Sequence, residues 1–85
     1  MNISRQEQRV LHVLALGGAI HVERASNGKV HHVACHTREG HILEGCDLDL
    51  FTRLRKRRFI KSTHGHPYRI TPLGGRAVRA QMFQR

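Results

Sequence analysis

The sequence predicts a small α+β protein in which helices and β-hairpins alternate in the order helix, hairpin, helix, hairpin, helix. Three observations predict this class: a capped amphipathic segment near the start, an Asn-Gly pair between two alternating runs, and a basic amphipathic segment that leads directly into a second pair of short runs. A chain of 85 residues has room for one hydrophobic core. We therefore expect a single domain over residues 1–85.

The first helix is predicted over residues 5–16. Ser4 and Glu7 have the spacing of a capping box, in which each side chain accepts a hydrogen bond from the other residue's backbone N–H. Gly17-Gly18 is a helix-ending signal. One apolar face is provided by Val10, Leu11, Val13 and Leu14. This helix is expected to be scaffold.

The first hairpin is predicted from the runs 19–25 and 30–36, which flank Asn27-Gly28. An Asn-Gly pair favours a two-residue type I′ turn, because both residues tolerate a positive φ. This turn fixes the pairs Ala25–Val30, Arg24–His31, Glu23–His32, Val22–Val33 and Ile20–Cys35. One face then carries Ile20, Val22, Val33 and Cys35, and the other carries His21, Glu23, His32 and Ala34. After a turn at 37–40, residues 41–46 favour a short third strand over a helical turn.

The second helix is predicted over residues 47–57, with Cys46 or Asp47 at its start. Its apolar stripe contains Leu48, Leu50, Phe51 and Leu54. The opposite face is predicted to carry Asp49, Thr52, Arg53, Lys56 and Arg57. Acidic residues in the first turn and the basic run 55–58 at the end both agree with the helix dipole.

The second hairpin is predicted to start at Phe59-Ile60 and to turn at residues 64–67, His-Gly-His-Pro. Tyr68 and Ile70 then alternate with polar residues, as in a half-buried strand. Thr71-Pro72 is a helix-opening signal, and a last helix is predicted over 72–83, with apolar contacts from Leu73, Ala77, Val78, Ala80, Met82 and Phe83. Gly74-Gly75 lowers its helix propensity, and close packing against the second hairpin is a plausible reason for these glycines.

Charge is strongly separated along the chain. Residues 1–49 contain five Lys/Arg and six Asp/Glu and have a net charge of −1, whereas residues 50–85 contain ten Lys/Arg and no acid. A cationic half in a small folded protein indicates a polyanionic partner, of which nucleic acid is the commonest. A generically basic protein without sequence selectivity is the alternative.

A basic helix followed directly by a basic hairpin is the recognition-helix and wing arrangement of winged helix-turn-helix proteins, and this is the fold class that we predict. The predicted function is non-catalytic nucleic-acid binding, with DNA preferred over RNA. Most of the predicted contacts are cations that would neutralise phosphates, while Arg53 or Lys56 could also reach base edges. The predicted contact residues are Thr52, Arg53, Arg55, Lys56, Arg57, Arg58, Lys61, His64, His66 and Arg69.

Zinc binding and ribonuclease catalysis are two less favoured interpretations of the sequence. His31, His32, Cys35, His36, His41 and Cys46 are of the types that bind zinc, but strand alternation separates Cys35 from His32 and His36, so no metal or other cofactor is expected. A ribonuclease would need a general acid and base beside a phosphate site. Glu23 with His21 or His32, or His64 with His66 beside Arg69, could be arranged in that way, although eight histidines produce such pairs by chance.

The order Phe51, Leu54, Phe59-Ile60, a turn, and Tyr-Arg-Ile-Thr-Pro-Leu-Gly at 68–74 resembles the second half of bacterial winged-helix regulators. Nearly the whole chain is similar to the small proteobacterial YjhX family. The similarity includes Ser-Arg-Gln-Glu-Gln-Arg-Val-Leu at 4–11, the His-rich hairpin, and residues 59–74. This resemblance implies the toxin of a toxin–antitoxin pair, with an antitoxin protein as a partner encoded nearby.

One departure from the regulators supports the main rival function. A winged helix usually has a supporting helix before the recognition helix, where this chain has its Asn27-Gly28 hairpin. The chain could therefore be a protein-interaction module that docks an acidic partner such as the antitoxin. A homodimer formed through the first helix or the last, near Met82-Phe83, is also plausible. The run 11–16 is too short to cross a bilayer, and two cysteines without secretory features favour reduced thiols in a cytoplasm.

Overall fold

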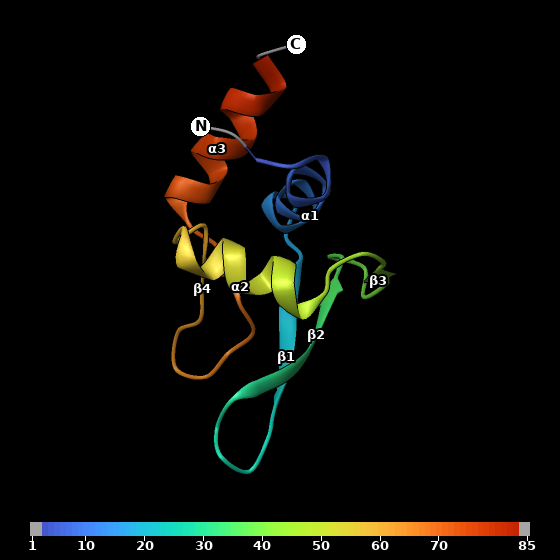
Figure 1. Cartoon of the computed structure of the whole chain (residues 1–85). Coiled ribbons are helices and arrows are strands. Elements are labelled where there is room, and N and C mark those ends of the chain that lie inside the picture. Colours follow the sequence, from blue (N-terminus) through green and yellow to red (C-terminus); the bar gives the residue numbers. More distant parts are fainter. Residues whose placement is uncertain (1–2, 84–85) are drawn as a thin grey trace.

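A computed structural model describes residues 3–83 of the chain, and Figure 1 shows how its elements are arranged. The elements are α1 (Arg5–Ala15), β1 (Ala19–Arg24), β2 (Val30–His36), β3 (Ile42–Leu43), α2 (Leu48–Lys56), β4 (Ile60–Lys61), β5 (Arg69–Ile70) and α3 (Pro72–Phe83). The strands form two antiparallel sheets, β1-β2-β3 and β4-β5. In Figure 1, α1 and α3 lie together at one end, α2 crosses in front, and the two hairpin loops extend from the other end.

The capping box predicted for the first helix is present in α1. The Ser4 Oγ accepts a hydrogen bond from the Glu7 N–H at 3.0 Å, and Glu7 Oε1 accepts one from the Ser4 N–H at 2.8 Å. Leu16 is the C-cap residue, and Gly17 follows it with a φ of 108°. The predicted boundaries 5–16 are therefore correct to within one residue.

The first hairpin has the predicted faces, but its turn differs from the prediction. Ile20–Cys35, Val22–Val33 and Glu23–His32 pair as expected, whereas Arg24 pairs with Val30. The predicted pairs Arg24–His31 and Ala25–Val30 are therefore wrong, because His31 is an extra residue in β2.

The structural cause is a longer loop than the predicted two-residue type I′ turn. The Gly28 N–H donates to the Ala25 carbonyl at 2.9 Å, and the Ala25 N–H donates to the Lys29 carbonyl at 2.8 Å. Gly28 has a φ of 85°, while Asn27 is not among the described residues with a positive φ. This is the three-residue hairpin in which a glycine follows an ordinary turn, and it accounts for the one-residue shift.

The second hairpin contains the mirror-image turn that was expected in the first. His64 and Gly65 have φ angles of 55° and 76°, and the His66 N–H donates to the Thr63 carbonyl at 3.1 Å. Two consecutive positive φ angles are the signature of a type I′ turn. Tyr68 also exchanges two backbone hydrogen bonds of 2.9 Å with Ile20. This pairing joins the β4-β5 hairpin to β1, and no sequence pattern predicted it.

The later helices also have side-chain caps, at Thr71 and at Asp47, which is one of the two residues expected at the start of the second helix. Asp47 Oδ1 accepts a hydrogen bond from the Leu50 N–H at 2.9 Å, and Thr71 Oγ1 accepts one from the Gly74 N–H at 3.1 Å. Gly74 packs against the Phe59 carbonyl and the Ile70 side chain, which confirms the close approach predicted for this glycine. A Cβ atom at Gly75 would reach only the end of the Arg79 side chain, at 4.0 Å, so the same reason does not hold for Gly75.

The buried residues form one core between the helices and the two sheets. Phe51 and Phe59 are its largest fully buried side chains, and the Phe51 ring meets the Tyr68 ring edge-on at 4.9 Å. Two apolar assignments were wrong: Leu48 has 40% of its surface exposed, and Ala80 is exposed. The fold is thus a small, compact α+β arrangement with three helices and antiparallel sheets, as far as residues 3–83 show.

The side chains of Met82 and Phe83, to which we assigned a possible dimer contact, lie outside the described part of the chain. No helix within residues 3–83 is long and apolar enough to cross a bilayer.

Candidate functional site

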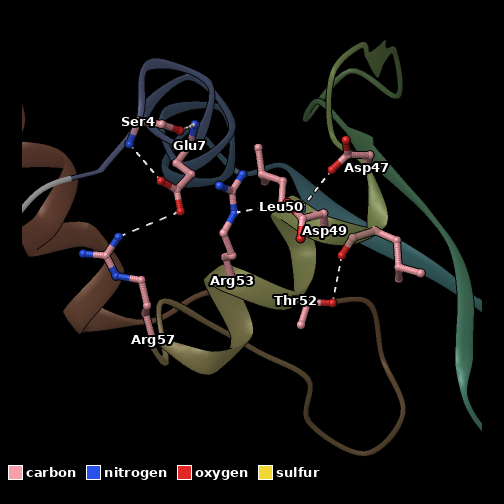
Figure 2. Close-up of polar contacts among 9 residues, drawn as sticks. Ser4, Glu7, Asp47, Asp49, Leu50, Thr52, Arg53 and Arg57 are labelled. Atoms are coloured by element: carbon pink, nitrogen blue, oxygen red, sulfur yellow. Dashed lines mark hydrogen bonds and ion pairs between the residues drawn. The ribbon is translucent and has the colours of Figure 1, made fainter.

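Two of the predicted cations on α2 have acidic partners (Figure 2). The Arg53 Nε lies 3.7 Å from Asp49 Oδ2, one helical turn away, and both side chains are at least half exposed. Such a pair is expected to be weak, because water screens it. Arg53 therefore lies on the exposed face of α2 as predicted, but the Asp49 carboxylate partly neutralises its charge.

Arg57 was predicted on the same exposed face, and this placement is wrong. Its guanidinium lies 4.8 Å from the centre of the Phe59 ring, and its Nη1 is 3.9 Å from Oε2 of Glu7 on α1. The Glu7 side chain is only 6% exposed, so it needs this cation and the Ser4 N–H as partners. Arg57 thus ties the end of α2 to the start of α1 (Figure 2). Helical spacing puts it beside Leu50, on the edge of the buried stripe.

The cations of α2 without an acidic partner within residues 3–83 are Arg55 and Lys56. Both are exposed. The Arg55 guanidinium lies 5.3 Å from the centre of the Phe51 ring, which orients it over the helix surface. Thr52, one turn earlier on α2, is half buried, and its hydroxyl donates a hydrogen bond to the Leu48 carbonyl at 2.8 Å. The cations of α2 without an acidic partner in the described residues therefore lie in its last turn.

The cations of the β4-β5 hairpin lie on a different surface. Lys61 and Arg69 pair directly across the two strands, and both are exposed, whereas Ile60 is buried and Ile70 half buried. Side chains alternate along a strand, so Lys61 and Arg69 point away from the core that α2 covers. Arg69 reaches back to the Gly17 carbonyl, with its Nη1 at 3.3 Å.

The remaining predicted residues lie at turns. His64 and His66 are exposed at the hairpin tip, and Arg58 is exposed directly after α2 with a φ of 62°. The ten predicted residues are therefore spread over the exposed face of α2, its C-terminal end, the hairpin tip and the outer face of β4-β5. They do not form one continuous cluster.

A second group of cations, which the prediction did not include, faces α2 from the first hairpin. Arg24 at the end of β1 and Lys29 in the loop line a hollow of about 400 Å³ together with Arg55. The other lining residues are Gly28, Val30, Leu48, Phe51 and Thr52. The signal was present in the sequence, because Arg24 continues the same strand face as Ile20 and Val22, beyond the point where the core ends.

The cysteines and histidines form no metal site within residues 3–83, where no three metal-binding side chains lie close enough to share an ion. Cys35 is fully buried in β2 and Cys46 is half buried just before α2, as the strand alternation predicted for Cys35. A hydrogen bond to Cys35, with burial and the nearby Asp47 carboxylate, raises the pKa of the Cys46 thiol. The rings of His21 and His36 stack with centres 4.4 Å apart.

Comparison with known proteins identifies the family. A family model described as "Putative toxin of bacterial toxin-antitoxin pair" matches residues 1–85. The chain belongs to this YjhX toxin family. UPF0386 proteins of Ruegeria sp., Beijerinckia indica and Aliivibrio fischeri are 56%, 54% and 52% identical to it, each over 100% of both chains. No solved structure matches the chain.

Membership of the YjhX family confirms the resemblance read from the sequence, and a toxin–antitoxin pair suggests a protein antitoxin as a partner. The family description names neither a target nor an activity. A function is therefore inferred from the cations of α2 and of the first hairpin that have no acidic partner among residues 3–83.

Proposed function

We propose that this YjhX-family protein is a nucleic-acid-binding protein with a winged-helix-like fold, that it prefers DNA to RNA, and that it acts without catalysis. The observation that carries the proposal is the charge of residues 50–85, which contain ten Lys/Arg and no acid. Only Arg53 and Arg57 of that half have acidic partners among the described residues. The other described cations of that half are available to neutralise phosphates, and the affinity of such contacts would fall steeply with salt.

The arrangement of elements supports the winged-helix-like part of the proposal. α2 is followed at once by the β4-β5 hairpin, which is anchored to β1 through Tyr68 and Ile20 (Figure 1). A recognition helix followed directly by a wing has this order. The β1-β2 hairpin and β3 occupy the place of the usual supporting helix, so the orientation of α2 is set by Arg57–Glu7 and by the core.

Binding of the purified protein to labelled duplex DNA and to structured RNA at about 50 mM and about 200 mM salt tests the proposal. The informative variant is Arg55→Ala/Lys56→Ala, because these cations are exposed on α2 and have no acidic partner within residues 3–83. The matched control is Arg5→Ala/Arg9→Ala, which removes two exposed cations from α1.

Tight binding at low salt that weakens about 10³-fold at the higher salt, and that falls in the α2 variant more than in the control, is the expected result. Equal losses in the two variants would refute the α2 site. Strand cleavage by the wild type that disappears in His32→Ala or His64→Ala would refute the non-catalytic part and favour a ribonuclease.

A second candidate is a protein-interaction module that docks an acidic antitoxin. Two observations favour it: the family description implies a partner protein, and Leu48 is exposed beside Arg24 and Arg55. Weak or salt-insensitive binding to both nucleic acids, with tight binding to the protein encoded beside this gene, would favour this candidate.

A further inference from the structure

The hollow between α2 and the tip of the first hairpin has the properties of a ligand site rather than of a flat basic surface. Its volume of about 400 Å³ lies in the range of small-molecule sites. Three cations line it, Arg24 and Lys29 from the first hairpin and Arg55 from α2, and no Asp or Glu is among its lining residues. Like charges repel one another when such a site is empty, and an anion would relieve that repulsion.

Two of the three cations are held in place before any ligand binds. Arg24 Nη1 donates to the Gly28 carbonyl at 2.8 Å, and the Arg55 guanidinium rests over the Phe51 ring. Fixed guanidinium groups lose less entropy on binding than free side chains, and they match the geometry of phosphate oxygens. Lys29 adds a third charge, on an exposed side chain.

The rest of the lining is largely apolar. Val30, Leu48 and Phe51 form this part of the wall, and Leu48 is exposed although helical spacing placed it in the buried stripe. A phosphate alone would not need an apolar wall. A nucleotide has a phosphate at one end and an apolar sugar edge and base face at the other, so its two parts match the two parts of this lining.

We propose that this hollow binds one nucleotide unit of a single-stranded nucleic acid, with its phosphate between Arg24, Lys29 and Arg55 and its sugar or base against Leu48 and Val30. This inference rests on the proposed function and deepens it. A duplex keeps its bases stacked inside and presents a convex phosphate surface, which cannot enter a hollow of this size. A splayed single strand can place one unit in it.

The test compares a labelled single strand of about 12 nucleotides with a duplex of the same length. The variant Arg24→Gln/Lys29→Gln removes two hairpin cations, and Arg5→Gln/Arg9→Gln removes two exposed cations from α1 as the matched control. We expect the hairpin variant to lose about 10-fold or more in affinity for the single strand, and no more than the control for the duplex. Leu48→Ser, which leaves the charge unchanged, is expected to weaken only single-strand binding.

Chemical shifts of backbone amides locate the ligand without any variant. Thymidine 5′-monophosphate is expected to shift the amides of Gly28, Val30 and Thr52, while thymidine without its phosphate leaves them unchanged. If the wild type binds the duplex, and the hairpin variant and the control lose the same affinity for the single strand, the inference is overturned but the proposed function stands. An oligoglutamate peptide that shifts the same amides as strongly would also overturn it, in favour of an acidic protein. A wild type that binds neither nucleic acid would overturn both.

Discussion

Replacing Arg58 with glycine should stabilise the protein. Arg58 follows the C-cap of α2 and has a φ of 62°, a left-handed conformation in which a Cβ atom is unfavourable. The conformation is imposed by the way the helix ends: the Phe59 N–H donates to the Leu54 carbonyl and the Arg58 N–H to the Arg55 carbonyl, both at 3.0 Å. This pair of bonds is a Schellman motif, in which glycine is the preferred residue at this position.

The size of the effect follows from these contacts. The left-handed conformation costs an L-residue about 1–2 kcal/mol, and glycine loses part of this gain because its unfolded chain is more flexible. Arg58 is exposed, and its backbone carbonyl, which accepts from the Thr71 hydroxyl at 2.7 Å, is retained in the variant. We therefore expect a net gain of about 0.5–1 kcal/mol, which is about 3–6 °C in Tm for a domain of this size.

Thermal and urea unfolding of Arg58→Gly and Arg58→Ala measures this gain. The alanine variant removes the same positive charge but keeps the Cβ atom, so it isolates the backbone effect. If Arg58→Gly unfolds at the same temperature as Arg58→Ala, or below it, the strain assigned to Arg58 is wrong. Both variants should also bind nucleic acid more weakly under the proposed function, so the glycine variant would be more stable and less active.

Two further predictions concern the core and the thiols. Gly74→Ala should destabilise the protein by about 2 kcal/mol or more, because the added Cβ atom would collide with the Phe59 carbonyl. Gly75→Ala should stabilise it by about 0.5–1 kcal/mol, because alanine has the higher helix propensity. Urea unfolding measures both changes, and a Gly74→Ala protein as stable as the wild type would contradict the packing. The hydrogen bond between the two thiols raises the pKa of Cys46 and lowers that of Cys35, so above about pH 8.5 the unfolded chain has lost both thiol protons while the folded pair still holds the proton of Cys46, and stability should fall as the pH rises further. Urea unfolding at pH 8 and pH 9.5 should show a smaller fall in Cys46→Ser, and identical falls would refute this assignment.

Features that depend on neighbours along the chain were predictable. The capping box of Ser4 and Glu7, the cap at Asp47 and the Thr71-Pro72 helix start all form as expected. Each needs only side chains within three residues of one another, so the sequence contains the whole interaction. The strand faces of the first hairpin were predictable for the same reason, since alternation is a local property.

The candidate site was less predictable, because charge in the sequence does not show which cations have partners. Arg57 was expected in solvent, but Glu7, which is 50 positions earlier in the chain, and Phe59 hold it at the edge of the core. Strand alternation places Arg24 on the face of Ile20 and Val22, but the meeting of Arg24 and Lys29 with Arg55 was missed because Arg55 is remote in sequence. The loop of the first hairpin was also mistaken, since Asn-Gly fits both a two-residue and a three-residue turn.

The sequence by itself determined the order of the elements, the helix caps and the separation of charge, because these follow from side-chain chemistry at short spacing. Only the tertiary structure decided that Tyr68 pairs with Ile20, that Arg57 meets Glu7, and that Arg24 meets Arg55 across a hollow. The physical reason is that packing among distant segments is settled by the core as a whole. Burial of the apolar faces brings these residues together, and these contacts cannot be predicted from residues that are neighbours in the sequence.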